Sequence, residues 1–93
     1  MSAPREVDCK AWSGSEFAIQ LMGAPAGTVM IYHRGLLSRD RRRTPEVDER
    51  AREALSLFEH GWCRLAQRRI RGHENNFEYV AIKIGVDKPP DGD

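Results

Sequence analysis

The chain has 93 residues, of which 40% are hydrophobic and 31% are charged. This length and composition predict one small folded domain and exclude a wholly disordered chain. The 15 Lys and Arg nearly balance the 14 Asp and Glu, so a uniformly basic nucleic-acid-binding surface is excluded. We expect no membrane association, because no apolar run is long enough to cross a bilayer. We also expect no secretory signal, because no apolar segment follows the basic residue near the start. Two cysteines are too few for a disulfide scaffold, which favours a cytoplasmic location.

A first helix is predicted to begin at Ser13. Ser13 and Glu16 have the spacing of a capping box, in which the two side chains satisfy unpaired amides at the helix start. Phe17 and Leu21 follow at the i, i+4 spacing of a buried face. A run of glycine, alanine and proline then ends the helix.

A strand and a short helix are predicted next. Residues 28–33 are rich in β-branched and aromatic side chains, which favour a strand. The basic stretch at residues 34–43 has room for a short helix at about residues 36–41. This part of the chain therefore carries much of the positive charge between two ordered segments.

The best-marked element is a long helix at residues 45–60. Thr44 is a favourable N-cap, Pro45 occupies the first helical position, and Gly61 follows the predicted end. Apolar residues repeat with the helical period and predict a single buried stripe. The stripe comprises Val47, Ala51, Ala54, Leu55 and Phe58.

Two strands, residues 62–69 and 77–84, flank a polar linker and predict a hairpin. In the second strand the aliphatic residues, such as Val80, alternate with a face that carries Phe77 and Tyr79. If the aliphatic face is core, the aromatic face is partly exposed and offers a surface for a homodimer or another partner. The alternative is that the aromatic residues pack against the first helix or the N-terminal segment.

The order of helix, strand, short helix, long helix and two-stranded hairpin resembles the winged helix-turn-helix family. The resemblance is firmest at residues 54–65, where an amphipathic helix ends at Gly61 and passes directly into a strand. Three short segments also loosely resemble small uncharacterised phage and prophage proteins. These segments are Tyr32–Gly35, Gln67–Arg69 and Phe77–Ala81.

The resemblance implies an α+β, winged-helix-like domain at residues 12–86. The polar residues 1–11 are predicted to be a flexible N-terminal tail, and the breaker-rich residues 87–93 a disordered C-terminal tail. Winged helices bind nucleic acids or proteins, so the fold alone does not decide the function.

One feature departs from a DNA-reading winged helix. In such proteins the second helix of the pair enters the major groove. Here residues 45–60 carry five acidic residues against two arginines, and the acids crowd the first turn. Base reading by this helix is therefore not expected.

Positive charge is concentrated in residues 34–43 and residues 64–73, and all of it is arginine. Arginine suits bidentate phosphate contacts, so these residues are predicted to bind the nucleic-acid backbone. The predicted contacts are Arg34, Arg39, Arg41, Arg42, Arg43, Arg64, Arg68, Arg69 and Arg71. The alternative is that they pair with acids of the long helix and only solvate the surface.

Motifs for catalysis or metal binding are absent. His60 and Cys63 have no second ligand pair, and His33 has no carboxylate partner at a readable spacing. We therefore expect no enzymatic activity, no metal and no cofactor. The sequence predicts a small DNA-binding or regulatory protein whose partner is duplex DNA. The alternative is a protein-binding module, such as a phage-encoded inhibitor or adaptor of an intracellular host protein.

Overall fold

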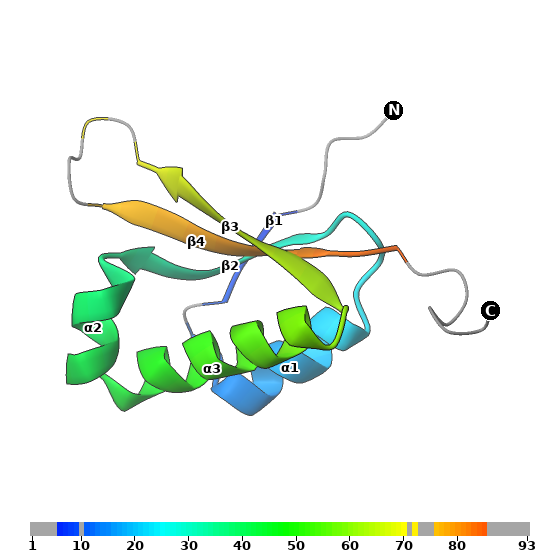
Figure 1. Ribbon diagram of the computed structural model, residues 1–93, viewed down its shortest axis with the longest axis horizontal. Helices are drawn as coiled ribbons and strands as arrows, with labels where there is room; N and C mark the ends of the chain where they lie inside the picture. Colours follow the sequence, from blue (N-terminus) through cyan, green and yellow to red (C-terminus); the bar gives the residue numbers. More distant parts are fainter. Residues whose placement is uncertain (1–5, 10, 71, 73–75, 86–93) are drawn as a thin grey trace.

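A four-stranded mixed sheet lies against three helices, which all lie on one side of it (Figure 1). This computed structural model describes residues 6–9, 11–70, 72 and 76–85, and it is a small α+β domain. The elements in chain order are β1 (Glu6–Asp8), α1 (Gly14–Met22), β2 (Val29–Gly35), α2 (Leu37–Arg43), α3 (Pro45–Glu59), β3 (Cys63–Arg69) and β4 (Phe77–Lys83). The strand order is β1-β2-β4-β3, in which β1 runs parallel to β2 and the other neighbours are antiparallel. Every helix and strand predicted from the sequence is present within a few residues of its expected bounds.

The N-terminal cap of α1 forms at Ser13, and the Ser13 half of the predicted capping box is present. The Ser13 hydroxyl accepts a hydrogen bond from the Glu16 amide at 3.1 Å, and Phe17 and Leu21 are fully buried. At the same end, the Gly14 amide donates to the Glu49 carboxylate of α3 at 3.1 Å. The start of α1 is thereby fixed both by its own cap and by the helix beside it.

The buried face of α3 differs from the predicted stripe. Leu57 is buried, whereas Leu55 and Phe58 are 49% and 48% exposed, so the prediction is wrong at these two positions. The reason is Arg50, which turns inward and is 5% exposed. Its guanidinium donates to the carbonyl oxygens of Tyr32 at 3.1 Å and Trp12 at 2.9 Å. A pattern that counts only apolar residues leaves Arg50 out, and it therefore predicts a buried face that is rotated about the axis of α3 from the observed one.

Both faces of the β3–β4 hairpin are covered in part. Ala81 is fully buried on the helix side of the sheet, where Tyr79 packs with its ring centroid 6.4 Å from that of Tyr32. Val80 is 1% exposed on the opposite side, where it packs with aliphatic residues of β2. Phe77 and Tyr79 are half-buried, as expected for the aromatic face, and the contacts of Tyr79 are with Tyr32 of β2 and Leu37 of α2 and not with the first helix. The sheet has two apolar clusters, one on each face.

The prediction of a flexible tail through residue 11 is wrong at residues 6–9. Residues 6–8 form β1, and the Cys9 amide donates to the Ile31 carbonyl at 2.9 Å. Cys9 and Cys63 are both free thiols in the core, where burial raises the pKa of Cys9 to about 12 and that of Cys63 to about 11. Residues 1–5 and the predicted tail at residues 87–93 lie outside the described residues.

Among the residues that the structure describes, no helix is long and apolar enough to span a bilayer.

Candidate nucleic-acid interface

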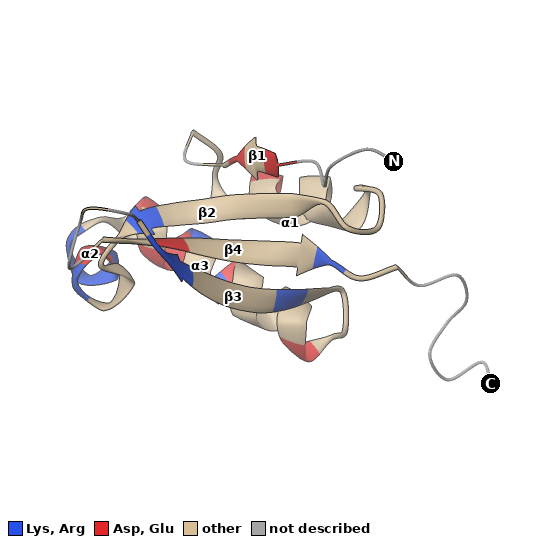
Figure 2. Ribbon diagram, turned by 90° about the horizontal axis from the view of Figure 1, so that it is seen from above, with Lys and Arg blue, Asp and Glu red and all other residues tan. Residues whose placement is uncertain are grey.

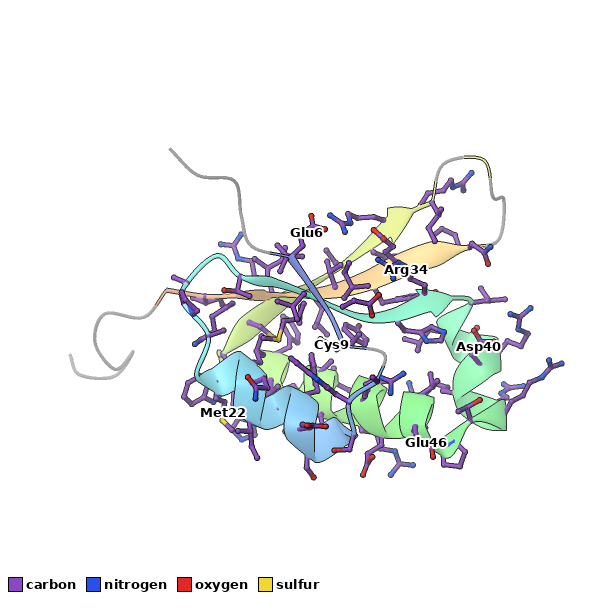
Figure 3. All side chains as sticks on the ribbon, turned by 180° about the vertical axis from the view of Figure 1, so that it is seen from behind. Glu6, Cys9, Met22, Arg34, Asp40 and Glu46 are labelled. Atoms are coloured by element: carbon purple, nitrogen blue, oxygen red, sulfur yellow. The ribbon has the colours of Figure 1, made fainter. Side chains whose placement is uncertain are left out.

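Two of the nine predicted arginines lie over the sheet, on the face away from α1 and α3. Arg34 Nε donates to Glu78 at 2.9 Å, and the same guanidinium pairs with Asp8. Arg68 donates to Glu78 at 2.7 Å and to Glu6 at 3.3 Å. These five residues, which we call the sheet-face network, come from all four strands; Figure 3 labels Glu6 and Arg34.

The sheet-face network sets two arginines against three carboxylates, so both arginines are fully paired. The hydrogen bond from Arg34 holds the pKa of Glu78 below its usual range, and Arg68 acts in the same direction. Glu78 and Asp8 in turn raise the pKa of Arg34. Neither arginine can turn toward a phosphate without giving up a carboxylate. The acids that hold them belong to strands, and not to the long helix as the sequence suggested.

Two α2 arginines also have carboxylate partners. Arg41 Nε donates to Asp48 of α3 at 2.7 Å, and this hydrogen bond lowers the pKa of Asp48. Arg39 Nε donates to its neighbour Asp40 at 2.9 Å and lowers the pKa of that carboxyl. The side chain of Arg39 remains 51% exposed, so its charge stays accessible to solvent.

Arg42 and Arg43 are different, because both are exposed and neither forms an ion pair with a described residue. Together with Ser38 and Arg39 they line an open hollow of about 310 Å³. We call Arg39, Arg42 and Arg43 the α2 arginine surface. Figure 2 shows the blue residues gathered at the end of the molecule where α2 and the end of β3 lie.

A larger groove of about 630 Å³ connects α2 to the hairpin. Arg41 and Arg42 line one wall, and Gln67 of β3 and Tyr79 of β4 line the other. The Tyr79 hydroxyl accepts a hydrogen bond from the Leu37 amide at 3.2 Å, which fixes the start of α2 to the sheet. The α2 arginine surface is thus held at a set position relative to the hairpin.

The remaining predicted arginines belong to β3 and the loop after it. The guanidinium carbon of Arg69 lies 5.7 Å from the centroid of the Phe77 ring, within the range of a cation–π contact. Arg69 is two residues from Gln67 and therefore shares its face of the strand. Arg64 is exposed, and Arg71 lies outside the described residues.

Two contacts were not predicted from the sequence. His33 Nε2 lies 2.8 Å from Asp40 Oδ2, so the expectation that His33 lacks a carboxylate partner is wrong. The turn between β2 and α2, where Gly35 has a φ of 130°, brings these residues together, and no helical or strand period encodes that spacing. The second is the contact of buried Arg50 with main-chain carbonyls. The sequence indicates this burial only through the position of Arg50 on the apolar period of α3.

Within the part of the chain that the structure describes, no group of three or more His, Cys, Asp or Glu side chains is placed to hold a metal ion. Comparisons with models of known families, with curated proteins and with solved structures find no match. What the chain binds must therefore be inferred from its own side chains.

Proposed function

We propose that this chain is a small non-enzymatic protein that binds the phosphate backbone of duplex DNA. The α2 arginine surface makes the contact, and Arg69 at the adjoining end of β3 extends it. The observation that carries the proposal is the pair Arg42 and Arg43, two adjacent exposed cations without carboxylate partners among the described residues. Guanidinium groups of this kind form bidentate contacts with phosphate oxygens.

A winged-helix-like architecture is part of this proposal. The order of elements from α1 to β4 is the one that the family resemblance implies, and β2, β4 and β3 are antiparallel neighbours in that order. The parallel strand β1 is an addition to that pattern. In this arrangement α2 and the hairpin adjoin across the larger groove, so one stretch of backbone can contact both.

Binding through phosphates, without base reading, follows from the charge of α3. Its first turn carries Glu46 and Asp48, which the phosphates that border a major groove would repel. Arg41 neutralises Asp48 and so shields the groove beside α2 from this negative charge. Affinity should then depend on salt and only weakly on sequence. Four phosphate contacts would give a log–log salt slope of about −3.6.

The test compares two double variants on random-sequence duplex DNA. Arg42→Gln with Arg43→Gln should reduce the magnitude of the salt slope by about 1.8, because two phosphate contacts are lost. The matched control, Arg34→Gln with Arg68→Gln, removes the same charge from the sheet-face network and should leave the slope unchanged. Fluorescence anisotropy at several salt concentrations measures both. Equal effects of the two double variants would show that the net charge matters and that the α2 arginine surface does not.

A protein-binding module is the second candidate, favoured by one observation. Leu55, Phe58 and Trp62 are 49%, 48% and 38% exposed, and they precede β3, which is an edge strand. Large exposed apolar side chains beside an edge strand are typical of protein interfaces or of a homodimer. A stoichiometric partner that survives nuclease treatment, together with no measurable DNA binding, would favour this candidate. Sedimentation of the purified chain tests the homodimer.

The free thiols bear on the cellular compartment. Cys9 and Cys63 are reduced and buried at separate positions in the fold. Unpaired cysteines are most common in reducing compartments, which supports a cytoplasmic location as part of the proposal.

A further inference from the structure

A cavity of about 450 Å³ lies apart from the α2 arginine surface and shares no lining residue with either hollow there. Its walls come from β1, β2 and α3. The lining residues are Asp8, His33, Arg34, Val47 and Arg50. A cavity of this size is within the range of sites that hold small molecules.

Arg50 is the unusual member of this wall. It is 5% exposed, and its two hydrogen bonds go to uncharged acceptors, the main-chain carbonyls of Tyr32 and Trp12. Its guanidinium forms no ion pair with any carboxylate of the described residues. Nη2 has no hydrogen-bond partner among these residues and is not fully buried, so this residue of the cavity wall keeps a free donor. A buried cation without an anion is unfavourable, and a bound anion would relieve that cost.

The other charged side chains on the wall each have a partner of opposite charge. Arg34 pairs with Asp8 and with Glu78, and His33 contacts Asp40. The positive charge of Arg50 is therefore the one that the described carboxylates leave uncompensated. Since Val47 supplies an apolar wall, water is partly excluded from the guanidinium, which strengthens a charge-assisted hydrogen bond there.

We propose that this cavity binds a small-molecule oxyanion, a phosphate or carboxylate group, on the guanidinium of Arg50. Arg50 is a binding residue in this proposal, and its two main-chain hydrogen bonds hold the guanidinium in position before the anion arrives. The site does not depend on DNA binding, because none of its residues belongs to the α2 arginine surface.

The experiment titrates the isotope-labelled chain with sodium phosphate, with sodium acetate, and with sodium chloride at matched ionic strength, by NMR. At least one oxyanion should bind saturably, with shifts at the Arg50 Nε–H and at the amides of residues 32–34 and 47–50. A ligand concentration ten times Kd should also raise Tm by roughly 5–10 °C over the chloride reference. The stronger of the two oxyanions identifies the preferred group. Shifts that do not saturate, or that are confined to α2, would overturn the site.

Variants separate this site from a general effect of salt. Arg50→Met removes the charge and should abolish saturable binding, whereas Arg52→Met, on the exposed side of the same helix, should leave it unchanged. If Arg50→Met does not fold, Val47→Met answers the same question, because it fills the cavity and leaves the hydrogen bonds of Arg50 in place. Binding that survives in the folded variant, or that is lost in Arg52→Met, contradicts the proposal. A change in DNA affinity alone does not bear on it.

Discussion

The arginines over the sheet and those on α2 have the same chemistry but different surroundings. Arg34 and Arg68 share Glu78 and reach Asp8 and Glu6 from neighbouring strands. Arg42 and Arg43 project from a short helix at the end of the molecule, where no described carboxylate reaches them. A count of arginines along the chain does not distinguish the two groups. What distinguishes them is the strand register, which places acids opposite one group only.

Arg50 is a third kind of arginine, because it is buried, and its substitution should have the largest effect on stability. Arg50→Ala should lower the free energy of unfolding by about 2–4 kcal/mol, because two charge-assisted hydrogen bonds are lost and two buried carbonyls are left unpaired. Arg52→Ala, two residues later and 76% exposed, should cost less than about 0.5 kcal/mol. Urea denaturation measures both. Similar costs would mean that the inward position of Arg50 contributes little to stability.

Glu78→Gln tests whether the sheet-face network is structural. It should cost about 1 kcal/mol, because its partners Arg34 and Arg68 are 44% and 41% exposed and the pairs are partly screened by solvent. It should leave Arg34 paired with Asp8 and Arg68 paired with Glu6, so neither arginine is freed and the salt dependence of DNA binding should not change. A steeper salt slope in this variant would show that one of these arginines contacts phosphate.

The pH dependence of this variant has a definite sign. The pKa of Glu78 is lowered in the folded chain, so its contribution is fully present above the ordinary carboxyl pKa and is lost as pH falls through the lowered value. The stability difference between the wild type and Glu78→Gln should therefore shrink as the solution is acidified below about pH 4. Denaturation at a series of pH values measures it. A constant difference would contradict the pairing with Arg34.

The smallest expected effect comes from the acid that holds Arg41. Asp48→Asn removes the partner of Arg41 and should steepen the log–log salt slope of DNA binding by up to about 0.9, since one more arginine becomes available. Asp48 also pairs with Arg52, and both contacts are accessible to solvent, so stability should hardly change. Anisotropy titrations of the variant beside the wild type measure the slope. An unchanged slope would place Arg41 outside the interface.

The secondary structure could be predicted because its signals are local. Ser13 caps α1 and Pro45 starts α3, and each acts on residues within one helical turn. Strand β1 could not be predicted, because it has one apolar residue, Val7, between two acidic ones. These three residues form a strand only by pairing with β2, more than twenty positions away. The face of α3 was misplaced for a similar reason: Arg50 is buried by carbonyls from other segments.

The candidate site divides in the same way. The sequence is sufficient to locate the basic stretches, since charge can be counted. It does not show which arginines are paired, because Glu6, Asp8 and Glu78 meet Arg34 and Arg68 only across the folded sheet. The contact of His33 with Asp40 depends likewise on a turn whose geometry no periodic pattern encodes.

The two buried thiols can report local unfolding of the chain through their rates of alkylation. Alkylating reagents attack the thiolate, and burial raises the pKa of both Cys9 and Cys63 so far that the folded chain presents almost none at neutral pH. Cys9 follows β1 at one edge of the sheet, and Cys63 begins β3 at the other. Each thiol therefore reacts only when its own edge opens, and two alkylation rates in one native sample give the separate opening free energies of the two edges.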